Sequence, residues 1–122
     1  MIDTSVLIAF FRNQLDEKSK RYLNGGVATL SIITRFEFEK WLLKVHRSSE
    51  REFLKQRLES TFETIGLDTE ICEKAAYYAH SEGLSTADAL IYATARVSGL
   101  NLATSDSDFK GKPGVLFAEP KK

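Results

Sequence analysis

This sequence has few of the residues that would define several other classes of protein. It has one cysteine, so no internal disulfide can form, and the helical pattern around Cys72 predicts a small buried hydrophobe there. Its two histidines, His46 and His80, lack the spacing of a zinc site, and we expect both at the surface. With seven glycines and two prolines in 122 residues, nothing reads as a linker, repeat or low-complexity tract.

Long hydrophobic runs and an excess of one charge are also missing. No apolar run is long enough to span a membrane, and the start Met1-Ile2-Asp3 is unlike a signal peptide, so we expect a cytoplasmic protein with no membrane partner. Seventeen basic and seventeen acidic residues cancel, so any nucleic-acid binding must be local. The basic candidates are Lys40, Lys44, His46, Arg47, Arg51, Lys55 and Arg57 on one helical stretch, with Lys18, Lys20 and Arg21 earlier. Ordinary solvated helix faces are the alternative interpretation.

The hydrophobic content of 43% is enough for the core of one domain, which we expect to cover residues 1–122. Buried parallel strands are expected at residues 27–30, 64–67, 100–104 and 115–118, with Met1 and Ile2 as a very short first strand. Helices are expected after Ser5, after Ser31, after a capping box of Ser49 and Glu52, from Asp68 or Thr69 through Ala79, and from Ser85 to Gly99. This alternation predicts an α/β sandwich with a central parallel sheet of about five strands between layers of helices.

Acidic residues follow two of the predicted strands. Asp3 comes directly after the first strand, and Asp106 and Asp108 follow the strand that ends at Thr104. Because parallel strands present their carboxyl ends at one edge of a sheet, where such folds bind ligands, these carboxylates are expected near one another. Taken singly, Asp3 could be a helix N-cap, and Asp106 and Asp108 could be turn residues that bond their own backbone.

Helical spacing distinguishes two glutamates of one predicted helix. Glu39 lies four residues after Arg35 and is interpreted as a solvated, ion-paired position. Glu37 lies four residues after Ile33 and four before Trp41, on an apolar stripe. A carboxylate on a buried stripe needs a partner, so Glu37 is the better functional candidate.

Asp88 has two interpretations. It is the last residue of the capping box Ser85-Thr86-Ala87-Asp88, which alone would explain a carboxylate at that position. It also lies at the edge of the apolar face that includes Ile91 and Ala95. Capping and metal contact are compatible, so both interpretations stay open.

If Asp3, Glu37, Asp88 and Asp106 converge, their charges require compensation. Two carboxylates about 5 Å apart repel by roughly 3 kcal/mol at an effective dielectric of about 20. Arg35, assigned to Glu39, is the one basic residue within these motifs. A divalent cation held by oxygen ligands is the simplest compensation, and Mg²⁺ or Mn²⁺ fits such a set. Bound ions would orient water against a phosphodiester and offset charge on the leaving oxygen, which predicts phosphodiester hydrolysis without a covalent nucleophile.

These motifs resemble the PIN-domain family over almost the whole chain, and especially the toxin ribonucleases of bacterial and archaeal toxin–antitoxin pairs. The opening Asp3-Thr4-Ser5-Val6-Leu7-Ile8 and the segment 31–37 resemble the regions that carry the first two acids, with Glu37 rather than Glu39 at the second position. The segment 85–95 is the closest match and places the third acid at Asp88, and Thr104-Ser105-Asp106 resembles the region of the fourth.

The resemblance implies a set of roles and partners. Asp3, Glu37, Asp88 and Asp106 would be the catalytic metal ligands, Asp108 would assist with a lower rank than Asp106, and Thr4, Ser5 and Thr104 would lie near the site. The resemblance further implies an endoribonuclease of structured RNA that forms a homodimer and is inhibited by a cognate antitoxin whose peptide covers the acidic cleft. Aromatic and apolar residues of the first two helices, Phe10, Phe11, Phe36, Phe38, Trp41 and Leu42, could supply an interface, or simply the core.

One departure concerns the first strand, which the family usually makes longer than Met1 and Ile2. Either the neighbouring strands suffice, or the chain begins a few residues inside the natural one.

Two other functions compete with the nuclease. A non-catalytic PIN-like binding module would keep the fold, although all four acids are present. A phosphotransfer enzyme or receiver domain would also place aspartates and Mg²⁺ at strand ends. However, Ser5 stands where a haloacid-dehalogenase-type enzyme needs a second aspartate, and Asp68 is the sole approximate candidate for a phosphorylated receiver aspartate.

Overall fold

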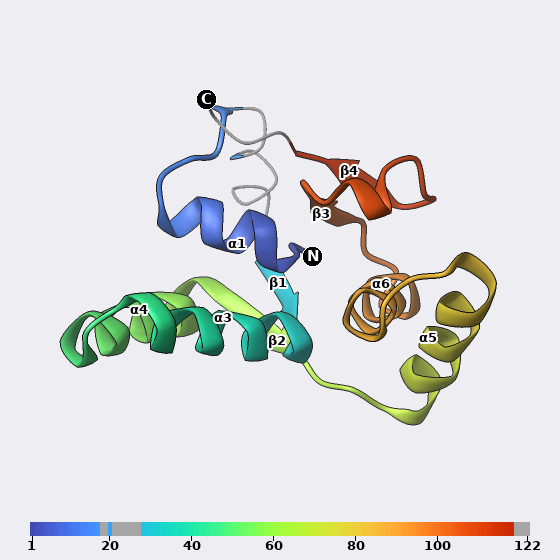
Figure 1. Ribbon diagram of the computed structural model, residues 1–122, viewed down its shortest axis with the longest axis horizontal. Helices are drawn as coiled ribbons and strands as arrows, with labels where there is room; N and C mark the ends of the chain where they lie inside the picture. The colour runs from blue at the N-terminus through green and yellow to red at the C-terminus, as the bar shows by residue number, and fades with distance from the viewer. Residues whose placement is uncertain (18–19, 21–27, 119–122) are drawn as a thin grey trace.

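The computed structural model describes residues 1–17, 20 and 28–118 and has the expected α/β architecture (Figure 1). Its elements in chain order are α1 (Thr4–Phe11), β1 (Ala28–Ser31), α3 (Ile32–Val45), α4 (Ser48–Thr61), β2 (Phe62–Ile65), α5 (Thr69–Glu82), α6 (Thr86–Val97), β3 (Leu102–Thr104), the 3-10 turn η1 (Ser107–Phe109) and β4 (Val115–Phe117). No helix among these is long and apolar enough to cross a membrane.

The strands form a parallel sheet whose middle position is a single residue. β1 pairs with β2 and β3 pairs with β4, both in parallel. Ile2 joins the two pairs, because it bridges Leu30 on one side and Ala103 on the other. Its amide donates to Thr29 O at 2.9 Å, and the next amide, of Asp3, donates to Ala103 O at 3.0 Å. The very short first strand is therefore confirmed.

The order across the sheet is β2, β1, Ile2, β3, β4. The chain begins in the middle, builds one side and then the other, so the strand order reverses at Ile2. In parallel sheets the crevice at such a reversal is the usual ligand site. The residue at that point is Asp3, and the turn after Thr104 lies at the same edge.

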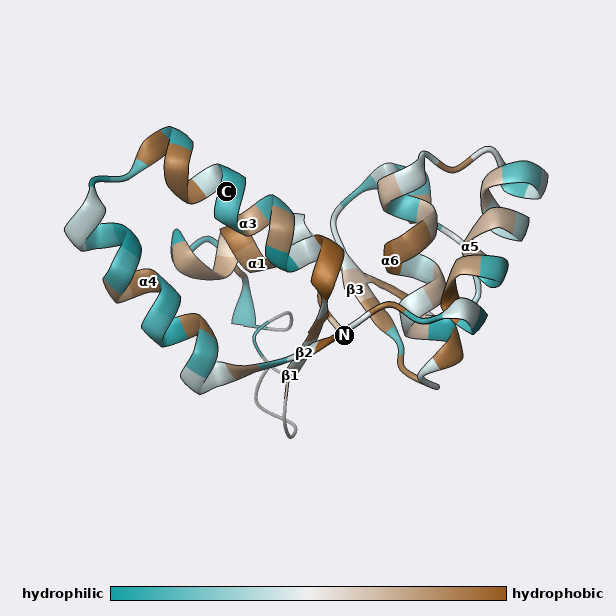
Figure 2. Cartoon of the chain, turned by 90° about the horizontal axis from the view of Figure 1, so that it is seen from below, coloured by the Kyte–Doolittle hydropathy of each residue, from teal (hydrophilic) through white to brown (hydrophobic). Residues whose placement is uncertain are grey.

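Two groups of buried side chains hold the sheet between its helices. One gathers around Ile2, Leu7, Leu30 and Phe38, and joins α1 and α3 to the sheet. The other gathers around Tyr92 and packs α5 and α6 against β3. By contrast α4 buries only Leu58, and Figure 2 shows it as largely hydrophilic along its length. The core thus lies under the elements that carry the strand ends.

Several predicted helix boundaries were wrong. The N-cap of α1 is Asp3 and not Ser5. The capping box of Ser49 and Glu52 does not form, since α4 begins at Ser48 after Arg47, without a side-chain cap. The N-cap of α5 is Asp68, one of the two predicted residues, but the helix continues past Ala79 to Glu82 and ends where Gly83 takes a left-handed φ of 68°.

Other expectations shifted or failed. The predicted strand at 64–67 lies at Phe62–Ile65, because Phe62 is the buried residue and Leu67 is exposed. Val27, expected in the second strand, lies outside the described residues. Cys72 is exposed rather than buried. His80 is exposed as expected, but His46 is half-buried with its ring 4.5 Å from that of Trp41.

Candidate metal centre

Asp3 is the most buried acidic residue of the candidate site, with 4% of its surface exposed. It follows Ile2 and caps α1, so its Oδ1 accepts from the Val6 amide at 3.2 Å. The Ser5 hydroxyl also donates to Oδ1, at 2.6 Å, and the Thr104 hydroxyl donates to Oδ2. Burial raises the pKa of Asp3, these hydrogen bonds act to lower it, and the nearby charge of Asp106 raises it.

Asp106 and Asp108 lie in the turn that follows β3. The Asp106 amide donates to the Thr104 hydroxyl at 3.0 Å, and the Asp106 carboxylate accepts from the Asp108 amide at 2.9 Å. Phe109, with none of its surface exposed, anchors this turn in the core. The expected turn role therefore holds for Asp106, whose carboxylate bonds the backbone two residues on, and both aspartates belong to the acidic cluster.

Asp88 lies in the first turn of α6. Its amide donates to the Ser85 hydroxyl at 3.2 Å, so the predicted cap is present. Burial, and then the charge of Asp106, raise the pKa of Asp88 to about 6, with smaller contributions from Asp108 and Asp3. The bond with Ser85 opposes that rise. Capping and membership of the acidic group thus coexist at this residue.

Three aspartates form a compact donor set. One carboxylate oxygen from each of Asp88, Asp106 and Asp108 lies within 4.8 Å of the other two. None of the ion pairs among the described residues involves these three or Asp3. A set of hard oxygen donors without a basic partner suits Mg²⁺ or Mn²⁺. Asp108, ranked below Asp106 from the sequence, is an equal member of this set.

Glu37 stands beside this set and not within it. It is half-buried on α3, and its Oε1 accepts a hydrogen bond from the hydroxyl of Thr4. Thr4 directly follows Asp3, so the bond ties α3 to the start of α1 next to the most buried carboxylate. The partner that the apolar stripe required is therefore a hydroxyl.

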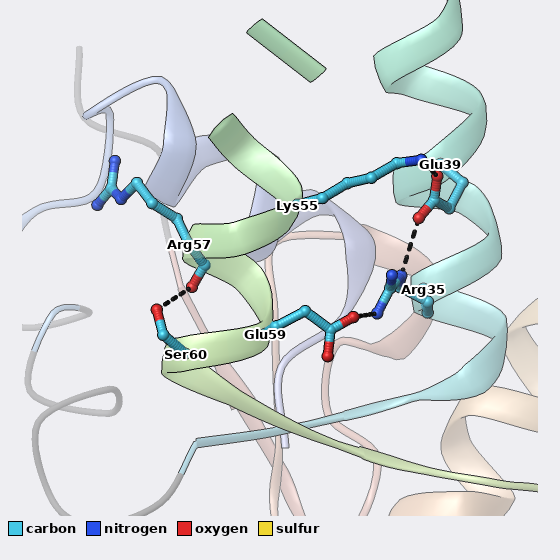
Figure 3. Close-up of polar contacts among 6 residues, drawn as sticks. All are labelled: Arg35, Glu39, Lys55, Arg57, Glu59 and Ser60. Atoms are coloured by element: carbon cyan, nitrogen blue, oxygen red, sulfur yellow. Dashed lines mark hydrogen bonds and ion pairs between the residues drawn. The ribbon is translucent and has the colours of Figure 1, made fainter. Parts of the chain in front are cut away.

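Glu39 has the ion-paired role expected for it. Its carboxylate lies 3.0 Å from Arg35 Nε and 3.1 Å from Lys55 Nζ, and Arg35 also pairs with Glu59 (Figure 3). Burial acts to raise the pKa of Glu39, but Lys55 and Arg35 outweigh it and lower the pKa. Two cations already occupy this carboxylate, which removes it from the candidate ligands.

The predicted basic stretch is divided between α3 and α4, and part of it serves the fold. Lys55 pairs with Glu39, and Arg51 donates to the His46 carbonyl at 2.8 Å. The Arg57 guanidinium lies 5.4 Å from the ring centre of Phe11. Lys40 and Lys44 are exposed, and no ion pair among the described residues involves them. Lys18 and Arg21 lie outside the described residues.

The receiver-domain interpretation does not fit the sheet. Its candidate, Asp68, follows β2, which pairs with β1 alone among the described residues, whereas the interpretation needs a middle strand. Asp68 is exposed and caps α5 by accepting from the Ile71 amide at 2.8 Å.

Two contacts of the site were not anticipated from the sequence. The Ser105 amide donates to the Ser5 hydroxyl at 3.2 Å, and in the same way the Asp106 amide donates to the Thr104 hydroxyl. The sequence suggested only that Ser5 and Thr104 lie near the site. The signal available was the presence of hydroxyl residues beside both acidic motifs.

Comparisons with known proteins agree with this fold. The sequence model of the PIN domain matches residues 1–115. A solved toxin–antitoxin complex from Klebsiella pneumoniae contains a chain 30% identical with a TM-score of 0.77, over 94% of this chain and 93% of that one. VapBC-5, a VapBC-family toxin–antitoxin system from Mycobacterium tuberculosis, contains a chain 28% identical with a TM-score of 0.65, over 95% and 94% of the two chains.

A third structure supports the fold alone. VapBC2 from Rickettsia felis, solved with a DNA fragment from its promoter, contains a chain with a TM-score of 0.74 at 16% identity, over 98% of both chains. No curated protein matches this sequence.

Proposed function

Because this chain belongs to the PIN domain family, we propose that it is a Mg²⁺- or Mn²⁺-dependent endoribonuclease and the toxin of a toxin–antitoxin pair. The fold alone would not support an activity, since one fold hosts many functions. The observation that carries the proposal is the convergence of Asp88, Asp106 and Asp108 to within 4.8 Å, beside the buried Asp3 and without a basic partner among the described residues.

The acidic residues have distinct parts in this proposal. Asp88, Asp106 and Asp108 would hold a divalent ion directly, and Asp3, whose charge reaches both Asp88 and Asp106, completes the negative centre. Glu37 borders the centre through Thr4 and would bind the second ion or a metal-bound water. We retain Asp3, Glu37, Asp88 and Asp106 as the catalytic set, with Asp108 as a further ligand.

The bound ion would supply a Lewis acid at the phosphate and a lower pKa for its water. The protein's own contribution is to hold its carboxylates in fixed positions. Asp3 is kept in place by two hydroxyls and an amide, and Asp106 by its own turn. Lys40 and Lys44, on the same helix as Glu37, are exposed cations available to RNA phosphates.

The direct test is RNA cleavage by the purified protein. Cleavage should require Mg²⁺ or Mn²⁺, stop in EDTA, and be lost in Asp3→Asn and Asp88→Asn. Glu39→Gln is the matched control, because it also removes one carboxylate charge but from a position that Arg35 and Lys55 occupy. Cleavage that persists in EDTA contradicts the proposal. Calorimetry that detects no divalent-ion binding near neutral pH would favour a non-catalytic binding module instead.

We also propose that the protein forms a homodimer and binds a cognate antitoxin. We propose the cytoplasm as its location, because an endoribonuclease would meet its RNA substrate there. The antitoxin is supported by the similarity to chains of toxin–antitoxin complexes. Protein contacts are supported by three large apolar side chains along one face of α3, Ile32, Phe36 and Leu43, which are 40%, 59% and 70% exposed. Sedimentation equilibrium of the purified chain checks the dimer, and a purely monomeric mass at micromolar concentration would refute it.

A further inference from the structure

Two hydroxyl groups connect Asp3 to the turn after β3, and they do so in the same way. Thr104 Oγ1 donates to Asp3 Oδ2 and accepts from the Asp106 amide at 3.0 Å. Ser5 Oγ donates to Asp3 Oδ1 at 2.6 Å and accepts from the Ser105 amide at 3.2 Å. Each oxygen of one carboxylate is therefore linked through a hydroxyl to one of two consecutive amides. We call these four bonds the hydroxyl bracket.

The donors fix the direction of every bond in the hydroxyl bracket. A backbone amide can only donate, so each hydroxyl oxygen must accept from it and direct its single hydrogen at Asp3. A carboxylate accepts at both oxygens, whereas a protonated carboxyl group would place a hydrogen against one of these hydroxyls. The hydroxyl bracket therefore matches the ionised form of Asp3, and it uses no cation to do so.

The hydroxyl bracket also sets a distance between two acids. Asp3 directly follows Ile2, the strand position at the centre of the sheet, and Asp106 is in a turn near the other end of the chain. Thr104, with none of its surface exposed, joins the side chain of one to the backbone of the other. Any movement of the turn away from Asp3 must break a buried hydrogen bond, which costs about 1–3 kcal/mol for the unsatisfied group.

We propose that Thr104 and Ser5 are positioning residues that orient Asp3 and hold the Asp106 turn at the spacing a divalent ion requires. The metal-binding part of this inference rests on the proposed function. The four hydrogen bonds of the hydroxyl bracket are independent of it. Groups that orient metal ligands without touching the ion commonly alter metal affinity by about 10- to 100-fold. The role is thus distinct from simple packing, which an isosteric apolar residue would preserve.

The test compares Thr104→Val, which keeps the shape and removes the hydroxyl, with Thr104→Ser, which keeps the hydroxyl. Thr94→Val is the matched control, because Thr94 is equally buried and its hydroxyl donates to the Leu90 carbonyl within α6, outside the hydroxyl bracket. Three quantities are measured: amide hydrogen exchange at Asp106 by NMR without metal, Mn²⁺ affinity by calorimetry, and the free energy of unfolding.

In Thr104→Val we expect the Asp106 amide to lose protection and Mn²⁺ to bind about 10- to 100-fold more weakly. Thr104→Ser should recover both properties, and Thr94→Val should change stability alone. Rapid exchange of the Asp106 amide in the unaltered protein would overturn the proposal, as would equal Mn²⁺ affinity in Thr104→Val and the unaltered protein. Loss of protection and of Mn²⁺ binding in a protein that cleaves no RNA would instead refute the nuclease and leave the positioning role standing.

Discussion

Replacing Asp88 with asparagine should stabilise the metal-free protein while removing its metal binding. Asp88 is half-buried in α6, and its pKa is raised to about 6 by burial and by the charge of Asp106. An ionised Asp88 is therefore unfavourable in the folded chain without a cation. Asparagine has a similar shape and no charge, so above pH 6 the variant avoids that cost.

The size of this stabilisation follows from the pKa of Asp88. A rise from 3.8 to about 6 is about two units, or about 3 kcal/mol at about 1.36 kcal/mol each. Solvent screens a half-exposed group, which reduces this by about half. The N-terminus of α6 favours a carboxylate by about 0.5 kcal/mol, which the variant loses. We expect Asp88→Asn to be more stable by about 1 kcal/mol at pH 8.

The pH dependence has a definite sign. Between the unfolded pKa of 3.8 and the folded pKa of about 6, the folded chain binds more protons at Asp88 than the unfolded chain. The contribution of Asp88 to stability therefore falls as pH rises through this window and is constant above it. The stability difference between Asp88→Asn and the unaltered protein should be near zero at about pH 4, grow to about pH 6, and then level off.

Urea unfolding in EDTA at several pH values between these limits measures the effect. Glu73→Gln, at an exposed position of α5, removes one carboxylate charge from a residue outside the acidic cluster and is the matched control. Without EDTA, Mn²⁺ at about 100 times its dissociation constant should raise the free energy of unfolding of the unaltered protein by about 2.7 kcal/mol and leave that of Asp88→Asn unchanged. The unaltered protein should then be the more stable of the two. An Asp88→Asn variant no more stable than the unaltered protein at pH 8 would refute the reasoning.

Two further predictions concern Glu37 and Phe109. Glu37→Gln should lower the rate of RNA cleavage by about 10-fold or more. Glu39→Gln should leave the rate unchanged, because Arg35 and Lys55 hold Glu39 away from the acidic cluster. Equal losses of cleavage rate in the two variants would contradict the distinction between these glutamates. Phe109→Ala should cost about 3–5 kcal/mol in urea unfolding, because the side chain is fully buried, and should weaken Mn²⁺ binding by loosening the Asp106 turn. Unchanged Mn²⁺ affinity in a folded Phe109→Ala protein would show that the packing of the Asp106 turn does not affect metal binding.

The sequence was informative wherever chemistry is local. Helical spacing alone separated Glu37 from Glu39, because partners three and four residues away are fixed by the helix. The Ser31 and Ser85 caps were predicted for the same reason and are confirmed. Alternation of strands and helices gave the parallel sheet, and the family resemblance is confirmed by the PIN domain match over residues 1–115.

Features that depend on distant residues could not be predicted this way. The Ser49 and Glu52 pattern is a valid cap in isolation, but α3 ends at Val45 and α4 already begins at Ser48, so Ser49 lies inside the helix. The hydroxyl bracket joins Ser5 to Ser105 across the length of the chain, and no spacing rule reaches that far. Likewise His46 is half-buried because the turn between helices folds it onto Trp41.

The single-residue strand at Ile2 has a consequence for the order of events during synthesis. Ile2 can complete its pairing only after both Leu30 and Ala103 have been synthesised, because it lies between them in the sheet. Asp3 gains its backbone partner in the same step. An incomplete nascent chain therefore holds no assembled acidic cluster, and this cluster can form only after the turn that carries Asp106 and Asp108 has been synthesised.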